Sequence, residues 1–179
     1  GGEELWLDGT ATMHPMDTLP EMDRGATVLV VEEDGGRIAE VPWGRPEDNR
    51  RVVRARVALA ADGSAQAVVT VEPIGLEGAV DRAIYSAENR RTEAIEQQWG
   101  RRFGACRVAD EEFSDLEDVD VPVSYRYRVE VPSYARKRGE GATFPASPFP
   151  LALSDDCPLI TRTHDLLLSA PKSSELEVR

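Results

Sequence analysis

Residues 53–71 read VRARVALAADGSAQAVVTV, and this stretch decides the fold. On each side of Asp62 and Gly63, apolar residues occupy every second position, which is typical of half-buried β-strands. A two-residue loop would place the two apolar sets on opposite faces. A three-residue loop over residues 61–63, with Gly63 in the left-handed region, joins them on one face. The sequence therefore predicts a hairpin with these cross-strand pairs: Val53 with Val71, and Val57 with Ala67.

Strand patterns also occur outside this hairpin. Two apolar runs, at residues 27–31 and 37–41, flank Asp34, Gly35 and Gly36 and predict a second hairpin. Alternation of apolar and polar side chains makes residues 123–131 the clearest single strand. Shorter runs predict a strand end and two closing strands at residues 5–7, 165–169 and 175–178.

Helical spacing begins after Gly75. Apolar residues recur three, four or eight positions apart between polar ones: Val80, Ile84, Ala87, Ile95, Trp99 and Phe103. The pattern predicts one amphipathic helix near residues 77–103, broken near residues 86–89 and ended by Gly100 and Gly104. The predicted fold is mainly β, of the α+β class: an antiparallel β-sandwich with one amphipathic helix packed on it.

Composition narrows the class of protein. Of the 179 residues, 41% are hydrophobic and 30% are charged, a globular balance that argues against wholesale disorder. The formal net charge of −12 repels phosphate backbones and anionic lipids, so nucleic acid is not an expected partner. Membrane insertion is not expected either, because no uninterrupted run of roughly 18 apolar residues is present.

The sequence has only two cysteines and two histidines, and their positions do not indicate an active site. Cys106, Cys157, His14 and His164 have no spacing typical of a metal site, and no cofactor or metal is expected. Neighbouring carboxylates raise the pKa expected for Cys157, and a helix C-terminus does the same for Cys106, so neither is a good nucleophile. The histidines are expected to be surface or packing residues. Between a Cys106–Cys157 bridge and two separate thiols, the sequence favours the thiols.

Two charge clusters are predicted to be solvated. Seven carboxylates lie between Asp110 and Asp120, but their order does not match a calcium loop, so a solvated loop is expected there. The basic run Arg136-Lys137-Arg138 is expected at a solvated loop tip. Four prolines keep residues 143–158 extended and out of helix.

Several short motifs carry a family resemblance. Residues 6–10 (WLDGT), 19–20 (LP), 23–25 (DRG) and 27–31 (TVLVV) resemble, in this order, the tail of the transglutaminase-like (papain-like thiol) core of large bacterial exported proteins. The later chain is similar to the β-rich domain of unknown function that follows that core. The matching features are residues 46–49, Asp62-Gly63, Gly75, Arg82, Arg162 and residues 166–168. Gly9 stands where the family motif usually has proline.

The resemblance implies a division of the chain and a role for Asp8. Residues 1–44 would be the terminal strands of the core, and residues 45–179 a β-rich accessory domain, with the connector at residues 43–49 between them. Asp8 matches the Asp of a Cys-His-Asp triad, whose Cys and His lie upstream in active members. The chain is then expected to be inert. Asp8 is equally well explained as a turn residue that accepts backbone hydrogen bonds beside Gly9.

The expected function is that of a non-catalytic accessory domain, structural or substrate-presenting, in a periplasmic or extracellular protein. Its expected partner is the rest of the transglutaminase-like polypeptide. An alternative is an extracellular protein- or glycan-binding β-sandwich module that uses exposed aromatic residues such as Trp43, Tyr134 or Phe149. A third hypothesis is an enzyme that uses Cys106 or Cys157.

Overall fold

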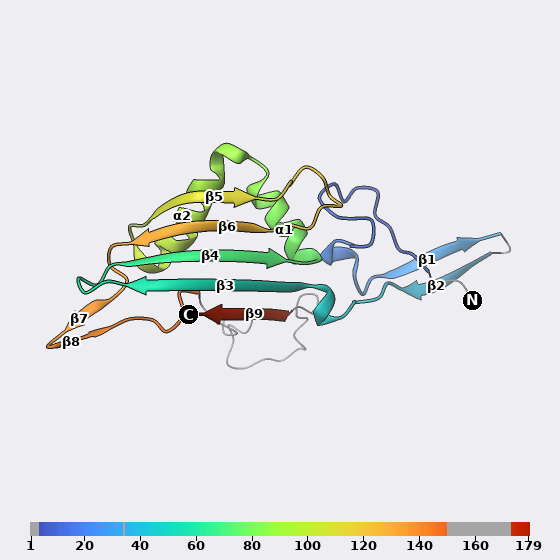
Figure 1. The fold of residues 1–179 in the computed structure, drawn as a ribbon. Coiled ribbons are helices and arrows are strands. Elements are labelled where there is room, and N and C mark those ends of the chain that lie inside the picture. The colour runs from blue at the N-terminus through green and yellow to red at the C-terminus, as the bar shows by residue number, and fades with distance from the viewer. Residues whose placement is uncertain (1–3, 34, 150–172) are drawn as a thin grey trace.

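A computed structural model describes residues 4–33, 35–149 and 173–179. Its centre is a five-stranded sheet in the order β5-β6-β4-β3-β9 (Figure 1). The strands are β3 (Arg50–Leu59), β4 (Ala65–Pro73), β5 (Arg107–Phe113), β6 (Tyr125–Val131) and β9 (Ser173–Val178). Neighbouring strands are antiparallel except β3 and β9, which are parallel.

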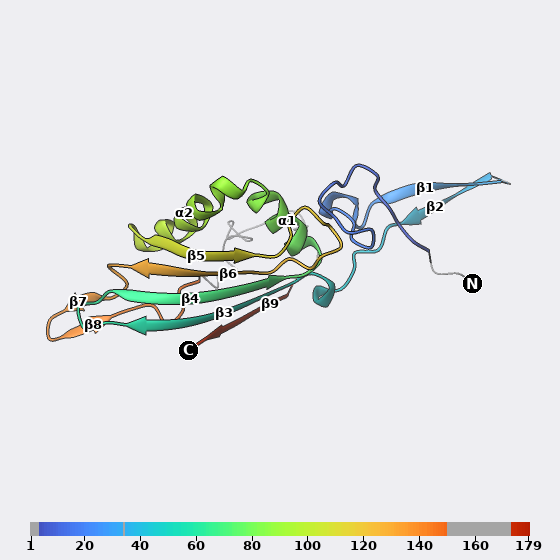
Figure 2. The same ribbon diagram turned by 45° about the horizontal axis from the view of Figure 1, so that its top comes forward.

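Two helices cover one face of this sheet, as Figure 2 shows from the side. They are α1 (Leu76–Tyr85) and α2 (Arg91–Phe103), and a short 3-10 turn, η3 (Glu88–Arg90), separates them. The predicted break in the helix is therefore confirmed. The predicted apolar face is confirmed in α2, where Ile95 and Trp99 are buried. It is wrong in α1, where Val80 and Ile84 are exposed.

The fold is mixed α+β and consists mostly of strands, so the predicted class is confirmed. The structure does not confirm a β-sandwich with one helix, because in the described ranges one five-stranded sheet carries two helices. The helices cover the apolar face of the sheet, which a second sheet would cover in a sandwich. The opposite face carries many charged side chains, such as Arg54, Arg56 and Arg126.

The β3–β4 hairpin has the predicted register. Val53 lies opposite Val71 and Val57 lies opposite Ala67. The Ala60 amide donates to the Ser64 carbonyl oxygen at 2.8 Å, which leaves a three-residue loop. Gly63 has a φ of 92°. Both the loop length and the left-handed glycine are therefore confirmed.

A matched pair of glycine substitutions tests this loop. Gly63→Ala is expected to lower the free energy of unfolding by about 1 kcal/mol, because L-residues avoid a positive φ. The added Cβ would also lie 3.1 Å from the Ala135 carbonyl oxygen. Gly100→Ala, in α2 with open space around it, should instead stabilise by about 1 kcal/mol. Urea denaturation measures both, and equal shifts of one sign would contradict the loop geometry.

The chain turns directly from β4 into α1 at Gly75. This residue has a φ of 63°, and a Cβ there would lie 2.0 Å from the Asp48 carbonyl oxygen. Asn49, which is buried, accepts a hydrogen bond from the Leu76 amide at 3.1 Å and so caps the start of α1. The close approach of residues 48–49 to this turn fixes where α1 begins.

Two smaller ribbons extend beyond the central sheet (Figures 1 and 2). The predicted hairpin β1 (Thr27–Glu32) and β2 (Gly35–Glu40) forms a separate two-stranded sheet. At the opposite end, β7 (Arg136–Arg138) and β8 (Gly141–Thr143) form a short exposed hairpin, so the basic run is solvated, as predicted, but lies in a strand. Residues 5–7 are not in a strand, which corrects that prediction.

Some predictions cannot be compared with the structure. The predicted strand at residues 165–169, the motif residues Arg162 and 166–168, and most of the proline-rich stretch lie outside the described residues. The predicted strand at residues 175–178 is present as part of β9.

Candidate functional site

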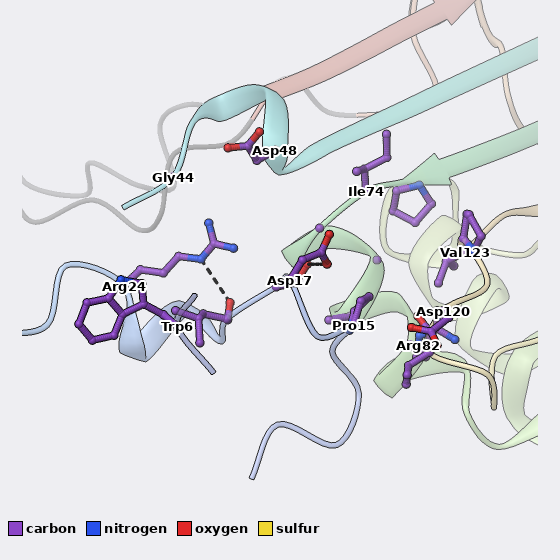
Figure 3. Close-up of a pocket in the computed structure, with 18 of the residues that line it drawn as sticks. Trp6, Pro15, Asp17, Arg24, Gly44, Asp48, Ile74, Arg82, Asp120 and Val123 are labelled. Atoms are coloured by element: carbon purple, nitrogen blue, oxygen red, sulfur yellow. Dashed lines mark hydrogen bonds between the residues drawn. The ribbon is translucent and has the colours of Figure 1, made fainter. Parts of the chain in front are cut away.

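A cleft of about 720 Å³ lies between residues 4–24 and the end of the sheet that carries α1. In Figure 3, Trp6 and Arg24 lie on one side of the cleft, and Arg82, Asp120 and Val123 lie on the other. The two sides come from segments that are about a hundred residues apart in places. The tertiary fold, and no local motif, therefore creates this cleft.

The cleft has apolar walls with charged groups among them. Five carboxylates line it: Glu4, Asp17, Glu47, Asp48 and Asp120. Arg24 also lines the cleft, and its guanidinium group donates to the backbone carbonyl oxygens of Leu19 at 3.2 Å and Trp43 at 3.3 Å. No cysteine or histidine is among the residues described as lining it. The arrangement can hold a ligand with apolar and cationic groups, but it presents no thiol or imidazole.

Arg82 anchors one wall of the cleft. Its side chain is almost fully buried, with 2% of its surface exposed. The two terminal nitrogens donate to five carbonyl oxygens of one loop: those of Asp115, Leu116, Asp118, Val119 and Val121, at 2.7–3.4 Å. One guanidinium group thus organises the backbone of the loop that continues into the cleft wall at residues 119–123.

This loop is the acidic stretch that the sequence predicts to be solvated. Its carboxylates are mostly exposed, as expected, and several cap turns: Asp115 accepts the amides of Glu117 and Asp118, and Asp118 accepts that of Asp120. Residues 110–113 are part of β5, which corrects the prediction that they lie in a loop. The loop does surround a cation, but that cation is the chain's own Arg82.

A second buried charge network joins α1 to the sheet. Asp81 has 2% of its surface exposed and accepts from Arg51 of β3 at 2.5 and 2.9 Å. Tyr125 of β6 donates to the same carboxylate at 2.9 Å, and Glu77 accepts from Arg51 at 2.7 Å. Burial and the charge of Asp81 raise the pKa of Tyr125, so its hydroxyl stays protonated and keeps donating.

Sequence reasoning did not single out Asp81 or Arg51, and it noted Arg82 only as a matching position of the family resemblance. A local signal exists: Gly78, Arg82 and Tyr85 share one face of α1, and a Cβ on Gly78 would lie only 3.3 Å from the Pro73 carbonyl oxygen. A glycine on the charged face of a helix indicates that this face, and not that of Val80 and Ile84, approaches another element.

Asp8 occupies a local turn in the N-terminal segment. Its carboxylate accepts both the amide and the hydroxyl of Thr10 at 2.8 Å. The Thr10 backbone and side-chain hydrogen bonds lower the pKa of Asp8, and the nearby Asp23 and His14 lower it further. Burial lowers the pKa of His14, and the charge of Arg24 adds to this effect. The structure brings Asp8 and His14 near each other, but neither lines the cleft.

Cys106 is partly buried against the hydrophobic core, just after the end of α2. It carries a free thiol, which donates to the Glu96 carbonyl oxygen at 3.3 Å. Burial and the charge of Glu96 raise its pKa, which makes the nucleophilic thiolate scarcer. Cys157 and His164 lie outside the described residues, so the structure tests the predicted separate thiols only at Cys106, which is free.

The three aromatic residues expected to be exposed are buried or half-buried in the structure. Tyr134 is buried and stacks on Phe103 with ring centres 5.0 Å apart. Phe149 is half-buried against Trp99. Trp43 is half-buried against Gly25, where a Cβ would lie 2.1 Å from the indole ring. These three rings pack against α2 or against residues 23–25, and the burial of their large apolar surface favours this packing over exposure to water.

No helix in the described ranges has the length and apolar character needed to span a bilayer. Among the same residues, no three Asp, Glu, His or Cys side chains gather closely enough to hold a metal ion. Comparison with protein-family models, curated proteins and solved structures finds no match to this chain.

Proposed function

We propose that this chain is the non-catalytic accessory part of a transglutaminase-like protein, with a structural or substrate-presenting role in the periplasm or outside the cell. The observation that carries the proposal is the exposed apolar face of the β1–β2 ribbon. Leu29, Val31 and Ile38 lie on this face and are 64%, 81% and 70% exposed. Their exposure leaves an apolar surface that a partner can cover.

The isolation of the ribbon supports this reasoning. Among the residues that the structure describes, its two strands pair only with each other, and the ribbon extends away from the central sheet (Figure 1). A two-stranded hairpin alone is marginally stable in water, and three strands or a packed layer usually stabilise it. In the family resemblance, residues 6–31 belong to the end of the core. The rest of that core is therefore the partner that we propose for this face.

The cleft supports the non-catalytic part of the proposal. Its described lining holds carboxylates, two arginines and apolar side chains, and the only hydroxyl side chain among these residues is that of Thr18. Thr10 already satisfies the carboxylate of Asp8. In the proposed role, Asp8 would orient a histidine supplied by the partner core, and the nearby cleft would hold a substrate segment.

Binding to a separately produced transglutaminase-like core, measured by calorimetry, tests the proposal. The double variant Leu29→Lys/Ile38→Lys should weaken binding at least tenfold, because it places two charges in the apolar interface. The control is Val80→Lys/Ile84→Lys, which makes the same chemical change on the exposed face of α1. An equal effect of both variants, or no binding by the unaltered chain, would contradict the proposal.

A further inference from the structure

The face of the central sheet opposite the helices carries a square of arginines. They project from β3 and β6, the two neighbours of β4: Arg54, Arg56, Arg126 and Arg128. The strand register makes two rows across the three strands: Arg54–Thr70–Arg126 and Arg56–Val68–Arg128. The side chains of Val68 and Thr70 are short, whereas the arginine side chains on both neighbouring strands are long. The surface over β4 is therefore lower than the surface over β3 and β6.

A groove of about 500 Å³ lies over this floor. Four arginines and one carboxylate line it: Arg54, Arg56, Arg126, Arg179 and Glu177. The local charge is thus positive in a chain whose net charge is −12. A concentration of one sign of charge in a groove attracts ligands of the opposite sign.

The arginines of this face differ in their pairing. Arg54 pairs with Glu72 at 2.6 Å, and Arg179 pairs with Glu177 at 2.5 Å. Outside the groove lining, Arg128 pairs with Asp110 at 2.8 Å. Arg56 and Arg126, by contrast, have no hydrogen bond or ion pair with any residue that the structure describes.

Arg56 and Arg126 face each other diagonally across β4. Adjacent strands lie about 4.8 Å apart and two residues of a strand span about 6.8 Å, so the two Cα atoms are roughly 12 Å apart. Two extended arginine side chains can converge over that distance on one small group above Thr70. The planar guanidinium fork matches the oxygens of such a group with two parallel hydrogen bonds.

We propose that this groove binds a doubly charged tetrahedral oxyanion, phosphate or sulfate, between Arg56 and Arg126, with the Thr70 hydroxyl as a further donor. A free anion and a sulfated polymer present the same chemical group. The site is separate from the cleft and from the β1–β2 ribbon, and it does not depend on the proposed function.

The test is a titration of the ¹⁵N-labelled chain at constant ionic strength, once with inorganic phosphate and once with a sulfated oligosaccharide. The Nε–H signals of Arg56 and Arg126 should shift saturably, and Arg56→Gln/Arg126→Gln should weaken binding at least tenfold. The control, Arg136→Gln/Arg138→Gln, removes the same charge from the exposed β7 strand and should leave the affinity unchanged.

The outcomes separate the possibilities. Similar affinities for the two ligands would support a site for a free anion, whereas much tighter binding of the oligosaccharide, lost in Arg56→Gln/Arg126→Gln, would support a polymer-borne one. Equal weakening in the control would overturn the proposal, because overall charge alone would then explain binding. Absence of saturable shifts with both ligands would overturn it as well.

Discussion

Asp81→Ala should lower the free energy of unfolding by about 3–5 kcal/mol, the cost of leaving one member of a buried ion pair without its partner. Asp81 holds both Arg51 and Tyr125, and through them it fastens α1 to β3 and β6. Without the carboxylate, the Arg51 guanidinium keeps Glu77 as its one charged partner among the described residues. Urea denaturation measures this loss of stability, provided that the m-value, the slope of the unfolding free energy against urea concentration, is the same in both proteins.

A matched control separates this effect from ordinary surface charge. Glu72→Ala removes the carboxylate of the exposed Arg54–Glu72 pair, whose side chains are both about half exposed. Surface pairs contribute about 0–1 kcal/mol, so this variant should lose far less stability. The double variant Arg51→Met/Asp81→Leu should recover much of the loss, because it removes both buried charges. If Asp81→Ala and Glu72→Ala lowered the free energy of unfolding equally, the buried Asp81 network would not be the source of the stability.

Arg82→Met should lower the free energy of unfolding by about 2–4 kcal/mol and loosen the loop at residues 114–122. The variant leaves five carbonyl oxygens without their donor, and unpaired buried polar groups cost about 1–3 kcal/mol each unless the loop opens to water. Arg82→Lys keeps the charge but offers fewer donors in a different geometry, so it should recover only part of the loss.

Hydrogen exchange and limited proteolysis locate the effect of Arg82→Met. Amides of residues 114–122 should exchange faster and the loop should become a cleavage site, while the strands of the central sheet keep their protection. Arg101→Met, on the exposed face of α2, is the control and should change neither stability nor loop protection. An intact loop in Arg82→Met would show that Arg82 does not organise it.

The parts of the fold that the sequence could predict are those with local causes. The β3–β4 register follows from one three-residue loop and one glycine, so alternation and turn chemistry were sufficient. The break between α1 and α2 is likewise local. The orientation of α1 is not, because Asp81 pairs with Arg51, 30 residues earlier in the chain, and Arg82 binds carbonyl oxygens 33–39 residues later.

Strand β5 shows a second limit. Asp110, Glu111 and Glu112 are consecutive carboxylates, which look like a solvated loop, and Asp110 has a φ of 55° where the pairing with β6 shifts. This irregularity interrupts the alternation that identifies a strand. The cleft also escaped prediction, since its walls come from distant segments, whereas the turn at Asp8 and Thr10 could be predicted from those residues alone.

The central claim is that the apolar face of the β1–β2 ribbon is covered by a transglutaminase-like core. Amide hydrogen exchange of this chain with and without that core tests the claim most directly. We expect the amides of residues 27–40 to exchange at least tenfold more slowly in the complex than in the free chain. Unchanged exchange in the ribbon, with protection gained elsewhere on the chain, would contradict the claim.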